Sequence, residues 1–280
     1  MSESAQATAP ERVLLRSISD RVEIAPGVHM PRLGLGTSQS APGEVEHAIE
    51  VAFDLGYRLV DTATAYRNER AIGAALAATG VPRQDYFVTT KVWADDQGYR
   101  PTLAAFETSC KKLKLDYIDL YLIHWPDPPN TAGTWKAMEE LLDGGSVRSI
   151  GVSNFTERDL ETLFETARVM PAVDQFELHP LRQRPYLQDY CRENEITIEA
   201  WAPLMRGKAH RVPELVAVGE RHGKTAAQVS IRWILQKEMV TVPKSVHAER
   251  IRENASVFDF ELSPEEMAAI DQLDRDQHAR

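Results

Sequence analysis

The sequence alternates between short apolar runs and longer amphipathic segments over most of its 280 residues. The apolar runs, which we interpret as β-strands, fall at 33–36, 58–61, 86–90, 117–123, 147–152, 172–176, 196–201 and 239–242. The segments that follow them repeat apolar residues at helical spacing. This spacing predicts helices at 43–55, 68–78, 101–114, 134–143, 156–168, 183–193, 212–222 with 225–236, and 247–254. Strands that alternate with helices in this way pair in parallel.

Eight such units in about 250 residues predict an α/β fold closed into a (β/α)8 TIM barrel. The competing fold is an open, doubly wound sheet, which usually carries Gly-x-Gly-x-x-Gly after its first strand. Here Gly34-Leu35-Gly36 is followed by Thr-Ser-Gln, so the barrel is favoured. An N-terminal β-hairpin is expected before the barrel, because segments 22–24 and 28–30 flank the turn sequence Ala-Pro-Gly.

The N-terminal segment and the cysteines indicate in which cell compartment the protein is expected to work. Residues 1–20 are polar and rich in Ala and Ser, with an apolar run too short for a signal peptide. We therefore expect a disordered tail over 1–20 and a single barrel domain over 21–280. Cys110 and Cys191 have no metal or disulfide spacing, which favours reduced thiols in a cytoplasmic protein.

Charge and hydropathy exclude some classes of partner. The formal net charge is −10, which disfavours nucleic acid and anionic membranes. No apolar run approaches the roughly 18 residues of a membrane helix. An anionic cofactor remains compatible, because screening over about 8 Å lets a local basic cluster dominate.

Four polar side chains stand where a barrel keeps its active site, at the carboxyl ends of strands. Asp61 and Tyr66 follow the strand at 58–61, and Lys91 and His124 end the next two strands. A nearby ammonium favours the ionised form of a tyrosine and lowers its pKa from about 10. We expect Asp61 to hold Lys91 charged and Lys91 to lower the pKa of Tyr66. His124 can orient a carbonyl oxygen toward the Tyr66 hydroxyl, which makes a proton donor aimed at a carbonyl.

The second half of the chain offers groups for a hydride donor, which the four residues need but do not supply. Ser153, Asn154 and Gln175 carry hydroxyl and amide groups suited to a nicotinamide carboxamide. Trp201 ends a strand and can stack on a planar ring. These positions predict one end of a dinucleotide site.

A basic segment near the end of the chain suits a phosphate. Lys244 and Ser245 precede a predicted helix that carries Arg250, which places two cations and a hydroxyl beside a helix N-terminus. Arg206 and Lys208 follow the strand at 196–201 and either approach a pyrophosphate or face solvent.

Other interpretations of these residues stay open at this stage. Asp61 and Lys91 alone would also suit a buried structural ion pair, and Lys91 a Schiff-base aldolase. An aldolase does not need the nicotinamide and phosphate groups. A third possibility is a barrel that binds a nicotinamide cofactor and serves as a redox-sensing partner for another protein, although a sensor could dispense with a complete set of four. His179 is interpreted as a hydrogen-bonded structural histidine rather than a ligand.

Seven sequence blocks resemble the aldo-keto reductase superfamily, in unbroken order over roughly residues 22–275. They read DTATAY, TTKVW, LYLIHWP, SIGVSNF, Gln175 with ELHP, WAPL and VPKSVHAERIREN. The order and Trp201 look most like bacterial 2,5-diketo-D-gluconate reductases. The resemblance implies a (β/α)8 barrel and Tyr66, Lys91, Asp61 and His124 as a catalytic tetrad.

The resemblance also implies NADPH (NADP+) as cofactor. It implies contacts to the adenosine 2′-phosphate and adenine from Lys244, Ser245, Arg250, Glu253 and Asn254. Further cofactor contacts are implied at Ser153, Asn154, Gln175, Trp201, Ala202, Leu204, Gly207 and Val246.

The expected function is reduction of small carbonyls to alcohols by a monomeric enzyme. The substrate classes are aldehydes, α-dicarbonyls such as methylglyoxal, and keto sugars such as 2,5-diketo-D-gluconate. Trp93, His124 and Trp125 are expected to contact the substrate, with Ala65 and the 127–134 loop framing the pocket. Ser38 replaces an aromatic residue that relatives often have, and the C-terminal tail is short, which implies an open pocket.

Overall fold

The computed structural model describes residues 16–279, and its central element is an eight-stranded sheet. Its strands are β3 (Leu35–Gly36), β4 (Leu59–Asp61), β5 (Phe87–Val92), β6 (Ile118–Ile123), β7 (Val147–Ser153), β8 (Val173–Glu177), β9 (Thr197–Trp201) and β10 (Val240–Thr241). They pair in parallel and in sequence order. Parallel bridges from Leu33 to Thr241 and from Gly36 to Lys244 join the two edges. The predicted (β/α)8 barrel is confirmed.

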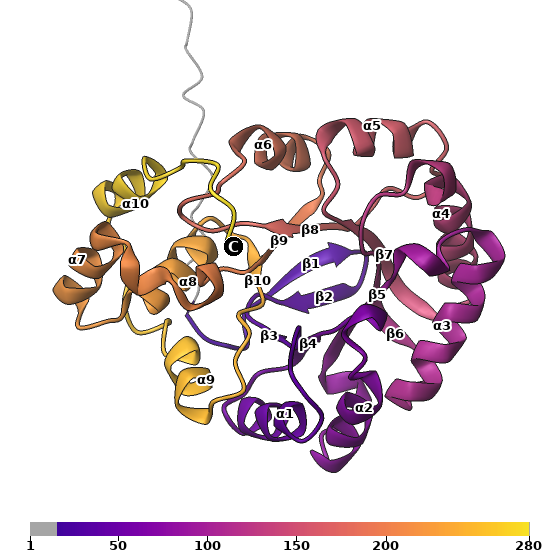
Figure 1. The fold of residues 1–280 in the computed structure, drawn as a ribbon, viewed down its shortest axis with the longest axis horizontal. Helices are drawn as coiled ribbons and strands as arrows, with labels where there is room; N and C mark the ends of the chain where they lie inside the picture. The colour runs from indigo at the N-terminus through magenta and orange to yellow at the C-terminus, as the bar shows by residue number, and fades with distance from the viewer. Residues whose placement is uncertain (1–15, 280) are drawn as a thin grey trace, which may run out of the picture.

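Helices surround the strands as an outer ring (Figure 1). They are α1 (Glu44–Asp54), α2 (Glu69–Ala78), α3 (Tyr99–Leu113), α4 (Pro128–Asp143), α5 (Glu157–Phe164), α6 (Pro185–Glu193), α7 (Pro213–His222), α8 (Ala226–Gln236), α9 (Ala248–Ala255) and α10 (Pro264–Asp271). Their apolar faces pack on the outside of the strands in one continuous core.

The prediction that residues 127–134 form a loop framing the pocket is wrong. Helix α4 already begins at Pro128, with proline in the first turn, where a missing N–H costs no hydrogen bond. The predicted helix at 134–143 is therefore the second part of a longer one. Helix α10 was not predicted, although Ser263 and Glu266 form a capping box at its start.

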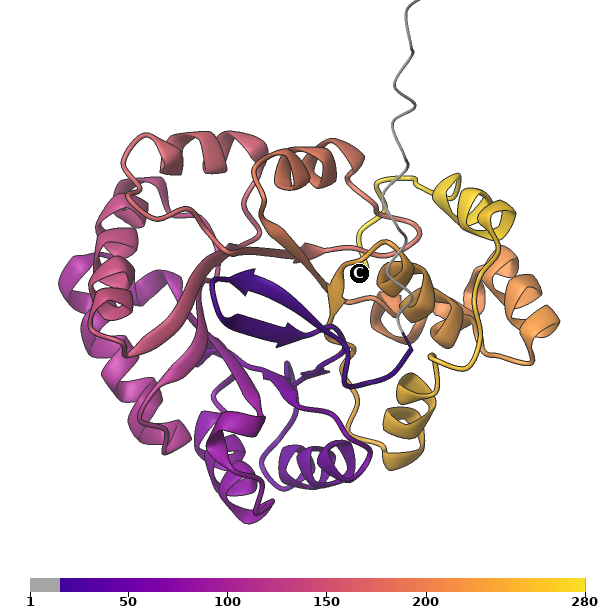
Figure 2. The same cartoon turned by 180° about the vertical axis from the view of Figure 1, so that it is seen from behind.

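The expected N-terminal hairpin is present and closes one end of the barrel. Strands β1 (Arg21–Ala25) and β2 (Val28–Pro31) pair antiparallel. Figure 2 shows this hairpin lying across the ring of strands. Met30 is fully buried and packs, with other hairpin residues, against Phe87 and Val173, which begin their strands. The amino ends of the strands are therefore sealed by apolar side chains.

The start of the described chain differs from the expected tail over 1–20. Residues 1–15 lie outside the described residues. In residues 16–20 the backbone N–H of Asp20 donates to the carbonyl of Ser17, and Ile18 packs against the main core. This short segment is therefore part of the folded barrel.

The part of the chain that the structure describes, residues 16–279, offers neither a membrane-spanning helix nor a metal-binding cluster. None of the helices described there is long and apolar enough to cross a membrane. The same residues contain no cluster of His, Cys, Asp and Glu that could hold a metal ion. Cys110 and Cys191 are both free thiols.

Candidate active site

A cavity of about 870 Å³ opens at the carboxyl ends of the strands. It is lined by all but one of the predicted site residues: Asp61, Tyr66, Trp93, His124, Trp125, Ser153, Asn154, Gln175, Trp201, Ala202, Leu204, Gly207, Lys244, Ser245, Val246, Arg250, Glu253 and Asn254. The exception is Lys91, which is completely buried behind the cavity wall. The structure therefore brings residues from nearly every strand end into one site.

The buried ion pair between Asp61 and Lys91 forms the floor of this site. Lys91 Nζ donates to Asp61 Oδ1 at 2.8 Å and Oδ2 at 2.6 Å, and to the carbonyl oxygen of Thr62 at 2.9 Å. Burial opposes the charge on Lys91, but the carboxylate of Asp61 and the phenol of Tyr66 outweigh it and raise the pKa of Lys91. Lys91 is therefore a fixed cation with no exposure to solvent.

Tyr66 ends a short 3-10 turn, η1 (Thr64–Tyr66), just beyond β4. Thr64 Oγ1 donates to the carbonyl oxygen of Lys91 at 2.9 Å, which fixes this turn against β5. Lys91 Nζ lies 5.3 Å from the centroid of the Tyr66 ring. Burial raises the pKa of Tyr66 more than Lys91 lowers it, and Asp61 adds to the rise. The expected net lowering of this pKa is wrong, and Tyr66 keeps its proton at neutral pH.

His124 follows β6 and faces the Tyr66 turn. Its ring lies edge-on to those of Tyr66 and Trp93, with centroid separations of 5.6 and 5.1 Å. Burial, together with the charge of Lys91, lowers the pKa of His124 to about 3. A neutral imidazole donates from one ring nitrogen and accepts at the other. His124 can thus offer a single N–H to a carbonyl oxygen without adding a charge.

The predicted carboxamide ligands form a connected hydrogen-bond network. Gln175 Nε2 donates to Asp61 Oδ2 at 2.9 Å, and Ser153 Oγ donates to the Gln175 carbonyl oxygen at 2.8 Å. Asn154 Nδ2 donates to the His124 carbonyl oxygen at 2.9 Å, and Trp201 Nε1 donates to Asn154 Oδ1 at 2.9 Å. The side chains that were expected to bind a nicotinamide are therefore held in place by the floor of the site.

The basic end of the cavity lies at the start of α9. Lys244 and Arg250 are both exposed there, and Ser245 is buried beside them. The N-cap of α9 is His247, which makes no side-chain capping hydrogen bond. Unpaired N–H groups at a helix start attract anions. Two cations and this helix end make a site for a phosphate group.

Some lining residues were not predicted from the sequence. Gly36 ends β3, Gln39 comes from the loop after it, and residues 225–227 come from the start of α8. Thr225 Oγ1 donates to Glu253 Oε1 at 2.5 Å, which ties α8 to α9. A Ser or Thr before a helix indicates an N-cap and does not indicate a ligand-binding residue. The sequence therefore did not predict that residues 225–227 line the cavity. Arg206 lines the cavity, whereas Lys208 is not part of the lining.

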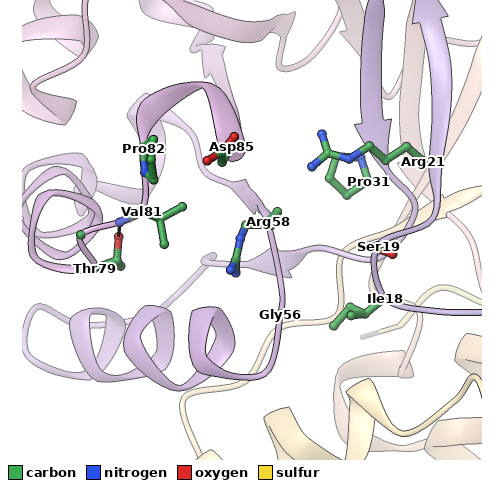
Figure 3. Close-up of a pocket in the computed structure, with 11 residues that line it drawn as sticks. Ile18, Ser19, Arg21, Pro31, Gly56, Arg58, Thr79, Val81, Pro82 and Asp85 are labelled. Carbon is green, nitrogen blue, oxygen red and sulfur yellow. Dashed lines mark hydrogen bonds between the residues drawn. The ribbon is translucent and has the colours of Figure 1, made fainter.

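A second cavity, of about 660 Å³, lies near the amino ends of the strands (Figure 3). Arg21, Arg58 and Asp85 are among its lining residues. Arg58 Nη1 donates to the carbonyl oxygens of Phe53 at 3.0 Å and Tyr57 at 2.6 Å, which are structural contacts at the end of α1. None of the predicted site residues lines this second cavity.

The larger cavity thus combines a protonated tyrosine, a neutral imidazole and a buried cation with a basic edge that suits a phosphate. That combination, at the carboxyl ends of a (β/α)8 barrel, defines a class of oxidoreductase that reduces carbonyls. A reductase of this class binds a nicotinamide cofactor and a small-molecule substrate.

Comparison with known proteins agrees with this class. The sequence profile of the Aldo/keto reductase family matches residues 31–275. The glyoxal reductase of Bacillus subtilis (strain 168) is 47% identical over 262 residues, which are 93% of this chain and 95% of that protein. The chain belongs to the Aldo/keto reductase family.

Solved structures extend the similarity to three dimensions. A crystal structure of an aldo/keto reductase from Brucella melitensis has a TM-score of 0.88 and 43% identity, over 91% of this chain and 100% of that one. A structure attributed to a 2,5-diketo-D-gluconic acid reductase B has a TM-score of 0.88 and 35% identity, over 96% of this chain and 94% of that one.

Proposed function

We propose that this enzyme uses NADPH to reduce small aldehydes, α-dicarbonyls and keto sugars, with Tyr66 as proton donor. One observation carries the assignment of roles. The buried Asp61–Lys91 pair meets the Tyr66 and His124 rings at the floor of the larger cavity. The glyoxal reductase and diketogluconic acid reductase relatives support dicarbonyls and keto sugars as substrates.

The residues present fit a phosphorylated dinucleotide. The cavity contains a flat aromatic side chain, Trp201, and amide groups at Asn154 and Gln175 at one end, and the cations Lys244 and Arg250 at the other. These two ends suit a nicotinamide and an extra phosphate, respectively. Glu253 and Asn254, on the α9 side of the lining, complete the proposed adenine end.

In the proposed reaction the cofactor, when bound, supplies a hydride to the carbonyl carbon. The Tyr66 hydroxyl donates its proton to the carbonyl oxygen, which carries the developing negative charge. His124 donates a hydrogen bond to the same oxygen and aims it at Tyr66. Lys91 stabilises the tyrosinate that remains, and Asp61 keeps Lys91 charged and in place.

The shape of the site supports a broad choice of substrate. Ser38, a small residue, stands in the lining, and Trp125 is 46% exposed at the opening. Trp93 packs against His124 and also lines the cavity. We further propose a cytoplasmic monomer in which residues 21–280 act as one domain.

The test is NADPH consumption with methylglyoxal, a diketo sugar acid, an aromatic aldehyde and a simple ketone. Tyr66→Phe removes only the hydroxyl group, so it should bind NADPH normally and lower turnover by about a hundredfold or more. Binding is followed by quenching of tryptophan fluorescence. Near-normal turnover in Tyr66→Phe would mean that another group donates the proton. NADPH binding without turnover of any carbonyl would favour the redox-sensing alternative.

A further inference from the structure

A fully buried acid that the mechanism does not use, Glu199, lies inside the barrel on β9. It stands in register with Gln175 of β8 and Val240 of β10. Side chains on a strand alternate between its two faces. Because Trp201, two residues further on, lines the cavity, Glu199 points into the barrel below the site.

The surroundings of Glu199 are poorly suited to a second negative charge. Neither carboxyl oxygen has a hydrogen bond of good geometry within the described residues, although the Gln175 amide lies close enough to favour the ionised form. The charged groups that face it are Asp61 and Lys91, with the amide of Gln175 between them. On the other side Val240 belongs to the apolar cluster under the hairpin.

We propose that Glu199 holds a proton in the working enzyme and is a positioning residue for the carbonyl reduction. It would act through the Asp61–Lys91 pair rather than by touching the substrate, because it does not line the cavity. This inference rests on the proposed function and its assignment of Tyr66 as proton donor.

The physical argument is a charge balance. With Glu199 protonated, the carboxylate of Asp61 and the ammonium of Lys91 cancel, and the positive end of the pair lies beside Tyr66. An ionised Glu199 would leave the interior with one net negative charge. That charge would weaken the stabilisation of a tyrosinate at Tyr66 and slow proton donation.

Electrostatics agree with a protonated state. Burial raises the pKa of Glu199 to about 8, and the charge of Asp61 adds to this rise, while Gln175 and Lys91 oppose it. The ionisation of Glu199 should therefore be seen as a loss of activity on the alkaline side of neutrality.

The neighbouring strand offers a matched control, Asp174. It is also fully buried, no side chain of the described residues hydrogen-bonds to its carboxyl group, and burial raises its pKa. Asp174 directly precedes Gln175, so it faces the helices, where the positive charge of Arg184 opposes the rise in its pKa. Asp174→Asn removes a buried acid without changing the barrel interior.

The first experiment measures single-turnover reduction between pH 6 and pH 10 for wild type, Glu199→Gln and Asp174→Asn, each loaded with NADPH. A required proton with a pKa near 8 predicts a roughly tenfold loss from pH 7 to pH 9 in wild type and Asp174→Asn. Glu199→Gln should lose less than about twofold over this range. KM should not move, because Glu199 lies outside the lining. Parallel profiles in wild type and Glu199→Gln would overturn the proposal.

A second measurement does not depend on turnover. An infrared titration of wild type should show the carbonyl band of a protonated carboxyl at pH 7 that is lost by pH 10. Because Asp174 is also buried with a raised pKa, the Glu199 band is the component that is missing from Glu199→Gln, or from Glu199→Met if the first variant does not fold, and that is retained in Asp174→Asn. An active enzyme without this band would contradict only the inference that Glu199 is protonated. A protein that shows the band but reduces no carbonyl sinks the proposed function, and the positioning role with it.

Discussion

At the scale of single residues, burial decides the protonation of the site more than the nearest charge does. Tyr66 stands beside the ammonium of Lys91, yet burial raises its pKa. Burial and the same ammonium both keep His124 neutral. The site therefore holds one buried ion pair and two neutral donors.

The residues of the site were predictable where each one follows a recognisable strand. Asp61, Lys91 and His124 were located in this way, because an apolar run that stops at a polar side chain is visible in the sequence. The sign of the net shift at Tyr66 was not predictable, because it depends on how deeply the folded barrel buries the phenol. Glu199 was missed because a single acid inside an apolar strand carries no local signal.

Arg250 provides a residue-scale prediction about the cofactor. Arg250→Ala removes a cation from the basic end of the cavity and should weaken NADPH binding by about ten- to a hundredfold, with little change for NADH. Arg252→Ala is the matched control, because Arg252 is exposed on the same helix outside the cavity lining. Dissociation constants from fluorescence titration are the measurement. Equal weakening of both nucleotides would place the extra phosphate elsewhere.

At the scale of elements, close contacts between helices hold the outer ring together. The backbone of α2 approaches the end of α3 at Gly73, where an added Cβ would lie 2.4 Å from the carbonyl oxygen of Leu113. Such a contact fixes the spacing of two helices that cover neighbouring strands. It can be found only in the folded structure.

The helix boundaries show which helices, and which of their ends, could be predicted from the sequence. The interiors of α1 and α8 were predicted closely, because their apolar spacing is regular. The start of α4 was missed, since Pro128 and Pro129 read as a loop unless they are recognised as a helix start. The capping box at Ser263 was a visible signal for α10.

Gly73→Ala tests the contact between these two helices. Alanine in a helix interior is normally about 1 kcal/mol better than glycine, but here the methyl group would clash with backbone. We expect a loss of about 1–3 kcal/mol in the free energy of unfolding, measured with urea. Ala74→Gly, at the next and exposed position, controls for helix propensity and should cost about 1 kcal/mol. A stabilised Gly73→Ala would show that α2 and α3 can move apart freely.

At the scale of the whole molecule, the barrel has two different ends. The amino end is filled by the β1–β2 hairpin and the apolar cluster beneath it. The carboxyl end carries the larger cavity and the polar floor. Residues at the amino end of the sheet therefore contribute mainly to stability, and residues at the carboxyl end form the candidate active site. This is the general arrangement in this fold.

Met30→Ala should separate these two contributions. Met30 is completely buried between hairpin and barrel, so its truncation should cost about 2–5 kcal/mol of unfolding free energy. NADPH affinity at a temperature where the variant is folded should match wild type, because Met30 lies outside the cavity lining. Met170→Ala, at a side chain 51% exposed, is the control and should change neither quantity. A large change in affinity for Met30→Ala would show that the two ends are coupled.

The sealed amino end also constrains the order of events during turnover. With the hairpin closing one side, two ligands that meet above Asp61 and Tyr66 enter and leave at the carboxyl end of the barrel. The molecule that lies deeper has to arrive first and depart last, since its neighbour obstructs the way out. This fixed order makes release of the deeper ligand a candidate for the slowest step of turnover. The constraint follows from the hairpin rather than from any group that takes part in the chemistry.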